Sequence, residues 1–330
     1  PGATQALVFA EYLERLVPVP GGEGSRLWVA AALLWSLGLV NYAGLRAGRP
    51  VQWVTSGVKV GGILIILGAG IFRGLNPANI SSTHAVASSD PISNFAGAML
   101  LVFFTYLGWD RLGNLAGEMK RPERDIPRVL VVSVLGVIAL YIGLAMVMHS
   151  VIPIEQLVGS KTPASDAARL LIGPWGEVLL AVIVLTATSS NINATILSSS
   201  RVYFTMSHDG GFLRGWLDRL HPTRFVPYLA VFAHVIWATI LLFAYGAVEG
   251  LIGSQVFSMT IWYSLMAVSC LRLRSRRPWV AVVFLAGLMV LGSAILWTRP
   301  QTAVANLVLM ASGAPVFWWI QARARSNSSA

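Results

Sequence analysis

Ten long apolar runs dominate this sequence and limit the folds that are open to it. A helix needs about 20 mostly apolar residues to cross the hydrocarbon layer of a membrane. Only helices and closed barrels satisfy every backbone polar group in lipid, and barrel strands alternate over about ten residues. The runs are longer and more continuous than that, so the sequence predicts an all-α, polytopic helical membrane protein. The ten predicted spans are Gly2–Val17, Leu27–Leu45, Val51–Phe72, Ile92–Ala116, Val129–Ile152, Glu177–Ser200, Pro227–Ala247, Leu251–Leu271, Trp279–Trp297 and Ala303–Ile320.

Composition excludes the main alternatives. Of 330 residues, 55% are apolar and 12% are charged, whereas about a quarter of an ordinary soluble domain is charged. A soluble globular protein, a disordered chain and a fibrous repeat are therefore all disfavoured. The one cysteine, Cys270, excludes an internal disulfide and a cysteine-rich metal site. The chain begins at Pro1 without the basic start of a signal peptide, so we interpret this end as cut.

Basic residues lie between the apolar runs, and they predict an orientation. Sixteen of the 24 lysines and arginines fall in connections after even-numbered runs or in the tail, and five fall in the other connections. The positive-inside rule places the first set in the cytoplasm, together with both chain ends. The formal charge of +10 is thus explained by topology in a cell membrane, with the lipid bilayer rather than nucleic acid as the partner. We expect one transmembrane domain over residues 1–330, with residues 321–330 as a cytoplasmic tail.

The fourth run is unusual because Asp110 and Arg111 are adjacent and deep in an apolar stretch. Charges there are costly, so they should pair or face a cavity. Glycines such as Gly108 and Gly113 make a continuous helix less secure, and a broken helix exposes backbone groups that can hold a carboxylate or an ammonium. An ordinary span whose charges reach the cytoplasmic interface is the other interpretation, and this stretch alone leaves both open.

The third run carries Lys59, eight residues from its start. Eight residues rise about 12 Å, which is near the midplane of a layer about 30 Å thick. An isolated lysine there is hard to keep charged without a partner, which suits a group that gains and loses a proton during transport. The alternative is a structural lysine bonded to carbonyls of a neighbouring helix, and we favour the functional interpretation.

The sixth run is rich in hydroxyl and amide side chains from Thr186 to Thr195. Most of them are expected to bond and pack between helices. Ser190, Asn191 and Thr195 lie near one helical face and are site candidates. The sequence holds no nucleotide-binding, metalloprotease or hydrolase motif, so we expect no enzyme, no cofactor and no metal. Energy for any transport would come from an ion gradient.

Three ordered motifs resemble amino acid permeases of the amino acid–polyamine–organocation (APC) superfamily. Phe104–Asp110 followed by Glu118–Arg128 is similar to the sixth helix and next loop of that family. Asn41-Tyr42 through Lys59 resembles its fourth and fifth helices. Ser198–Met206, with His221-Pro222 and Pro227, resembles its eighth helix and the following loop.

The resemblance implies a fold of five-plus-five inverted repeats with discontinuous first and sixth helices. It implies alternating-access transport of amino acids or related amines, with proton coupling at Lys59, which matches a fifth-helix lysine in the place of a sodium ion. Phe104 matches a gating aromatic in the unwound sixth helix, and the eighth-helix face approaches Lys59. The predicted substrate-binding residues are Phe104, Tyr106, Leu107, Gly108, Trp109 and Asn191, and the predicted ion-coupling residues are Lys59, Ser190 and Thr195.

The ten runs match family helices three to twelve, so the first two helices are absent from this sequence. We expect the site near the midplane, between the fourth run, the sixth run and that first helix. Leu107 departs from the family pattern, in which a small or acidic residue is usual. A truncated remnant that does not transport is the alternative, and an intramembrane enzyme is disfavoured because no catalytic cluster is present. The sequence identifies neither the amino acid nor a partner subunit. Everything rests on one prediction, which is a helix interrupted around Leu107–Trp109.

Overall fold

The computed structural model describes residues 1–17, 22–44, 49–73, 76, 79, 90–109, 112, 119–153, 156–157, 160, 162–210, 213, 215–273, 277–315 and 318. Every regular element with bounds in these ranges is a helix. In chain order they are α1 (Gly2–Leu16), α2 (Gly22–Tyr42), α3 (Arg49–Arg73), α5 (Pro91–Thr105), α6 (Pro122–Val151), α8 (Pro163–Ile172), α9 (Pro174–Gly210), α10 (Tyr228–Tyr245), α11 (Val248–Arg272), α12 (Pro278–Thr298) and α13 (Pro300–Ala311).

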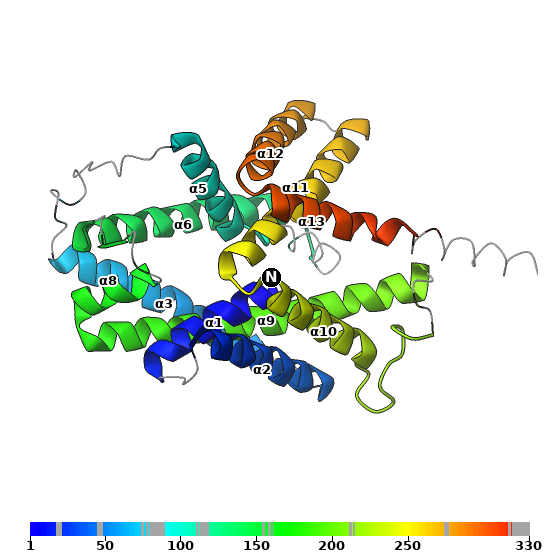
Figure 1. Cartoon of the computed structure of the whole chain (residues 1–330), viewed down its shortest axis with the longest axis horizontal. Helices are drawn as coiled ribbons and strands as arrows, with labels where there is room; N and C mark the ends of the chain where they lie inside the picture. The colour runs from blue at the N-terminus through cyan, green and yellow to red at the C-terminus, as the bar shows by residue number, and fades with distance from the viewer. Residues whose placement is uncertain are drawn as a thin grey trace, which may run out of the picture.

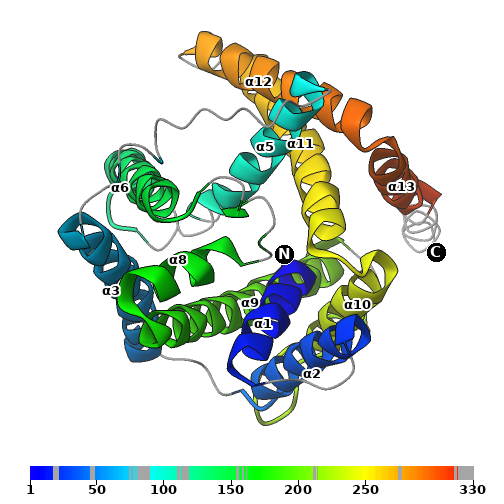
Figure 2. The same ribbon diagram turned by 60° about the vertical axis from the view of Figure 1, so that its left-hand side comes forward.

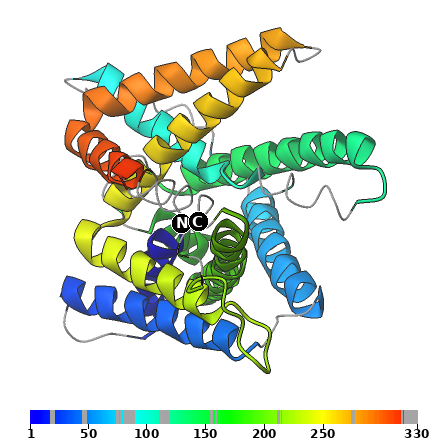
Figure 3. The same cartoon turned by 90° about the vertical axis from the view of Figure 1, so that its right-hand side faces the viewer.

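The helices pack in three groups, each around its own apolar cluster (Figures 1 and 2). The first cluster joins α1, α2, α9 and α10, with Ile192 and Leu242 fully buried in it. The second joins α5, α11, α12 and α13, and the third joins α3, α6 and α8 to α9. Within the second group, α11 and α12 lie side by side (Figure 3). The long helix α9 therefore contributes to the first and third clusters, and α11 contributes to the first through Leu251 and to the second through Ile252.

Proline marks where many of the helices begin. Pro91, Pro122, Pro163, Pro278 and Pro300 each occupy one of the first two positions of a helix. The ring fixes φ near the helical value, and the missing N–H would have had no partner in the first turn.

Helix α5 has a side-chain cap in addition to its proline. Asp90 accepts hydrogen bonds from the hydroxyl and the backbone N–H of Ser93, the latter at 3.1 Å. These bonds stabilise the carboxylate and lower the pKa of Asp90 below its usual value. The start of α5 is thus fixed by local chemistry at the end of the helix opposite to the predicted interruption.

The all-α membrane architecture is confirmed, and within the described ranges six helices are long and apolar enough to cross a membrane: α3, α6, α9, α10, α11 and α12. The predicted spans at α1, α5 and α13 are shorter, with 15, 15 and 12 helical residues. At about 1.5 Å per residue these helices reach about 18–23 Å, less than the hydrocarbon thickness. The reason in α5 is that the predicted span Ile92–Ala116 leaves helical geometry after Thr105. Asp110, Arg111 and Glu118 lie outside the described residues, as does the tail 321–330.

Two boundaries differ from the sequence prediction. α8 is a short helix that the apolar runs did not indicate, because it has only 10 residues and carries Asp166 and Arg169 among its apolar ones. α6 begins at Pro122 rather than near Val129, and Pro127 lies inside the helix. The stretch with two prolines is therefore the first part of a helix rather than a turn followed by a helix start.

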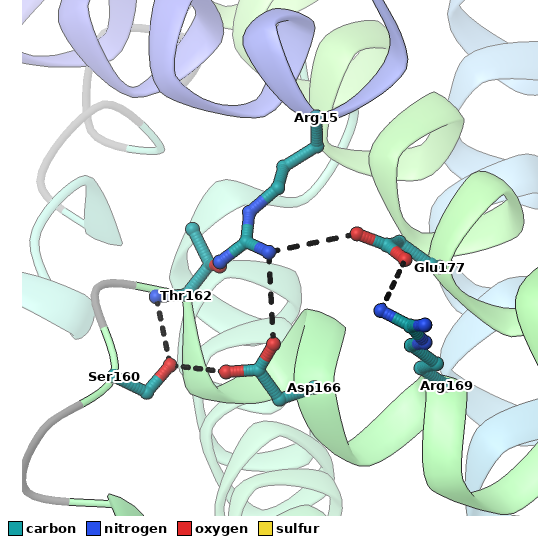
Figure 4. Close-up of polar contacts among 6 residues, drawn as sticks. All are labelled: Arg15, Ser160, Thr162, Asp166, Arg169 and Glu177. Atoms are coloured by element: carbon teal, nitrogen blue, oxygen red, sulfur yellow. Dashed lines mark hydrogen bonds and ion pairs between the residues drawn. The ribbon is translucent and has the colours of Figure 1, made fainter.

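A polar network joins α8 to the ends of α1 and α9 (Figure 4). Nη1 of Arg15 lies 3.8 Å from Oδ1 of Asp166 and 3.6 Å from Oε1 of Glu177. The side chain of Arg15 also donates to the Thr162 hydroxyl. One guanidinium thus links three helix ends. The members are Arg15, Ser160, Thr162, Asp166, Arg169 and Glu177.

Glycines let α3 approach two neighbouring helices closely. A Cβ at Gly62 would lie 2.0 Å from Cδ1 of Ile183 in α9, and a Cβ at Gly70 would lie 2.4 Å and 2.6 Å from the two Cγ atoms of Val147 in α6. Nothing lies within 4 Å of the Cβ position at Gly68. Contact between α3 and its neighbours therefore depends on particular glycines.

We expect Gly70→Ala to destabilise the protein by about 1–3 kcal/mol, because the β-branched Val147 is stiff and cannot move aside freely. The matched variant Gly68→Ala in the same helix should be neutral or slightly stabilising, since alanine favours the helix. Thermal unfolding of the purified protein in detergent measures both. Equal effects of the two variants would contradict the close packing of α3 on α6.

We also expect Arg15→Met to cost about 1 kcal/mol or more, since it leaves Asp166 and Glu177 without their shared cation. Arg169 is 65% exposed and touches only Glu177, at 3.9 Å, so Arg169→Met should change stability by less than about 0.5 kcal/mol. Thermal unfolding at low and high salt compares the two. A larger loss for Arg169→Met would show that Arg15 is not the centre of this network.

Candidate functional site

The predicted interruption of the fourth apolar run is present. α5 ends at Thr105, where the N–H groups of Tyr106 and Leu107 turn back to the carbonyls of Phe103 and Phe104, both at 3.2 Å. Gly108 follows with a φ of +111°, which L side chains rarely adopt, and nothing lies within 4 Å of its Cβ position. The backbone therefore leaves the helix within four residues and passes through a conformation that favours glycine.

Aromatic side chains from α6 and from the neighbouring helices α11 and α12 pack around this interruption. The ring of Tyr106 lies 5.6 Å from that of Tyr141 in α6. The ring of Trp109 lies 5.4 Å from that of Tyr263 in α11 and 6.3 Å from that of Phe284 in α12. Such pairs hold the turn by ring packing, where helical hydrogen bonds are given up.

Two further predicted residues fix the turn from the apolar side. Phe104 and Leu107 are half-buried and pack against the cluster formed by α11, α12 and α13. Gly108 and Trp109 are exposed. Of the predicted site residues in this stretch, Gly108 and Trp109 are thus the most accessible to a ligand.

Lys59 lies in the middle of α3, and its side chain is half-buried. Arg73 at the end of α3 donates to the carbonyl of Leu170, and Gly62 meets Ile183, so α3 and α9 run antiparallel. Lys59 is one turn beyond Gly62, which brings it level with the stretch of α9 that leads to Ser190. No described residue lies within hydrogen-bond or ion-pair distance of its ammonium group.

The predicted residues on α9 differ in exposure. Asn191 is exposed, Ser190 is half-buried and Thr195 is buried at 3%. Ile192 and Ile196 are buried in the first cluster. Of the three predicted residues on α9, Asn191 is therefore the most accessible to a ligand.

The predicted site residues fall in different packing groups. Phe104 to Trp109 belong to the group of α5, α11 and α12, whereas Lys59 and the α9 residues belong to the groups on the other side. Two hollows stand out among the described residues, one of about 80 Å³ between α2, α9 and α10, and one of about 350 Å³ with apolar walls between α5 and α12. Neither hollow is lined by a predicted site residue. The roles of the predicted residues in substrate binding and ion coupling therefore stay predictions.

Sequence reasoning missed two buried asparagines. Asn41 donates from Nδ2 to Oδ1 of Asn193 at 2.7 Å, joining α2 to α9. Asn306 in α13 is 1% exposed, and its Oδ1 accepts from the hydroxyls of Ser254 at 2.8 Å and Ser258 at 3.3 Å. A lone amide in an apolar run is the only signal of either. In the described part of the chain no cluster of histidine, cysteine or acidic residues could hold a metal.

Comparison with known families decides what kind of protein this helical arrangement belongs to. The model of the family described as "Amino acid permease" matches residues 2–323. The chain belongs to the amino acid permease family. Membership confirms the APC-type, multi-pass helical membrane protein that the motifs indicated, and this is a family of transporters rather than enzymes.

Several curated proteins are similar to this permease. The serine/threonine exchanger SteT of Bacillus subtilis is 27% identical over 335 aligned positions, which cover 97% of this chain and 75% of SteT. The Asc-type amino acid transporter 1 of Mus musculus is 25% identical, covering 96% of this chain and 62% of that protein. The branched-chain amino acid permease BcaP of Bacillus subtilis is 29% identical over 48% of this chain and 32% of BcaP.

Gly108 offers a direct test of the interrupted helix. We expect Gly108→Ala to cost about 1–3 kcal/mol in stability, because alanine is strained at this φ although space is open around it. Gly97→Ala in α5 is the control, since its Cβ position is equally open and its backbone is helical. Thermal unfolding of each variant reports the difference. Equal midpoints for both variants would show that Gly108 does not carry the turn.

Proposed function

We propose that this permease is a secondary transporter of amino acids or related amines that works by alternating access and is coupled to protons. The family supports transport, and the relatives named above act on amino acids according to their names. Because those names differ in the amino acid, the proposal commits to the class of substrate and not to one member. The whole chain is taken as one transporter domain in the cell membrane with both ends cytoplasmic.

The observation that carries the proposal is the end of α5 at Thr105, followed by Gly108 at positive φ. Where a helix stops inside a membrane, its backbone groups are no longer all used within the helix. The N–H groups of Tyr106 and Leu107 have carbonyl partners. No described residue accepts a hydrogen bond from the backbone N–H of Gly108. A zwitterion beside this turn would meet backbone dipoles together with the ring of Trp109.

The packing supports movement between two states. The interruption lies in the group of α5, α11, α12 and α13, and the polar face of α9 lies in another group with its own core. The two cores share no buried residue, although α11 has a residue in each, so the two groups can move relative to one another with α11 between them. Phe104 would close access to the substrate, and Asn191, which is exposed, would contact it from α9.

Lys59 is the proposed coupling residue, and Ser190 and Thr195 on α9 are proposed to take part in ion coupling. The support for Lys59 is the register of α3 and α9, in which Gly62 meets Ile183 and Lys59 lies one turn away, near the start of the polar stretch of α9. A midplane amine without a fixed acidic partner among the described residues is suited to lose its proton when the pathway changes sides.

Uptake of radiolabelled amino acids tests the proposal. The full-length protein is reconstituted in proteoliposomes, and a panel of unlabelled amino acids and amines competes for uptake. We expect uptake above that of empty liposomes and competition by a subset of the panel. Absence of uptake for every amino acid, with folded protein confirmed by thermal unfolding, would refute the transport function.

For coupling, we expect Lys59→Ala to lose the stimulation of uptake by an inward proton gradient, by about tenfold or more, while substrate still raises the unfolding temperature. Lys120→Ala is the matched control, because Lys120 is an exposed lysine just before α6. The measurement is the initial uptake rate with and without the gradient. Stimulation that survives Lys59→Ala would remove proton coupling at this residue and leave transport itself intact.

A further inference from the structure

The hollow of about 80 Å³ between α2, α9 and α10 has a lining unlike the rest of the described helix contacts. It lies where the connection between α9 and α10 folds back beside the end of α2 (Figure 1). A single water needs only about 10–15 Å³, so this hollow has room for a larger polar group. Its walls include Asn41, Asn193, Ser200, Arg201, Phe225 and Val226.

The paired amides of Asn41 and Asn193 leave the Nδ2 donors of Asn193 for a ligand. Asn41 is 7% exposed, and its Nδ2 donates to the carbonyl of Leu37 at 2.8 Å and to Oδ1 of Asn193 at 2.7 Å. Both amide hydrogens of Asn41 are therefore used, and its geometry fixes Asn193 as an acceptor through Oδ1. Among the described residues no acceptor takes the Nδ2 hydrogens of Asn193, which lines the hollow.

Arg201 brings a positive charge to the same lining. No described residue accepts from its guanidinium or pairs with it. The neighbouring Arg224 is different, because it donates to the carbonyl of Tyr42 at 3.3 Å and its guanidinium lies 4.8 Å from the centre of the Tyr42 ring. Arg224 thus joins the connection between α9 and α10 to α2, whereas the N–H donors of Arg201 are available for a ligand. Arg201 is charged and no aspartate or glutamate is present among the described residues that line the hollow, so their field is positive.

The remaining wall is apolar. Leu197, Val226 and Val231 line the hollow, and Phe225 at its edge is 70% exposed. Donors from the half-buried Asn193 and the exposed Arg201 on one side, and apolar surface on the other, match a phosphate group that continues into a glycerol and acyl chains. A basic pocket between helix ends at the membrane boundary is the setting in which lipid headgroups are recognised.

We infer that this hollow is a phosphate-binding site, filled by the headgroup of an anionic phospholipid, with Arg201 and Asn193 as the donors. The site is separate from the interruption of α5 and does not depend on which solute the permease carries. Its occupation would tie α2, α9 and α10 together at the basic end of the bundle.

Thermal unfolding of the full-length protein in a neutral detergent tests the inference. Dioleoylphosphatidylglycerol, dioleoylphosphatidylcholine and inorganic phosphate are titrated separately. We expect phosphatidylglycerol to raise the unfolding temperature, and Arg201→Gln to weaken its apparent affinity by about tenfold. Asn193→Asp keeps the acceptor for Asn41, removes the donor and adds a repelling charge, so it should weaken the affinity at least as much. Arg219→Gln is the control, because this exposed arginine of the same connection does not line the hollow.

Three results would overturn the inference. Equal loss for Arg201→Gln and Arg219→Gln would mean that only general positive charge attracts the lipid. Unchanged affinity in both Arg201→Gln and Asn193→Asp would remove the hollow as the site. An Arg201-dependent response to inorganic phosphate, without one to phosphatidylglycerol, would overturn the lipid as the source.

Discussion

Inside a membrane no water replaces a lost backbone hydrogen bond, and this constraint decides where a helix can stop. α5 stops at Thr105 because the next two N–H groups find carbonyls one turn back and because Gly108 tolerates a φ of +111°. The turn is packed against protein, because Tyr106 and Trp109 contact aromatic rings from α6, α11 and α12. An interruption that is shielded in this way can present backbone dipoles to a solute without unfolding the span.

The three apolar clusters explain how the turn after α5 is anchored while its position relative to α9 can change. Leu107 and Phe104 anchor it to one cluster, while α9 builds its own cluster with α1, α2 and α10. Glycines set the distance between helices where they meet most closely, as Gly62 and Gly70 do on α3. Polar contacts such as those of Arg15 act at the helix ends, where water or headgroups can share the charge.

Much of this organisation could be predicted from the sequence. Long apolar runs mark helices because lipid leaves the backbone few alternatives, and the glycines with Asp110 and Arg111 marked the interrupted run. α8 could not be found as an apolar run, since it has only 10 residues and carries Asp166 and Arg169 among its apolar ones. The pairing of Asn41 with Asn193 depends on which faces of α2 and α9 meet, and a single sequence does not encode that register in any visible pattern. The relative positions of Lys59 and Trp109 depend on packing between groups for the same reason.

Helix α11 has a property that follows from its position rather than from any one side chain. Leu251 is buried in the cluster of α1, α2, α9 and α10, and the next residue, Ile252, is buried in the cluster of α5, α12 and α13. Adjacent residues on a helix point about 100° apart, so a twist of α11 about its own axis changes the packing on both sides together. α11 therefore couples the two clusters, and a change at the α5 turn would reach α9 through it.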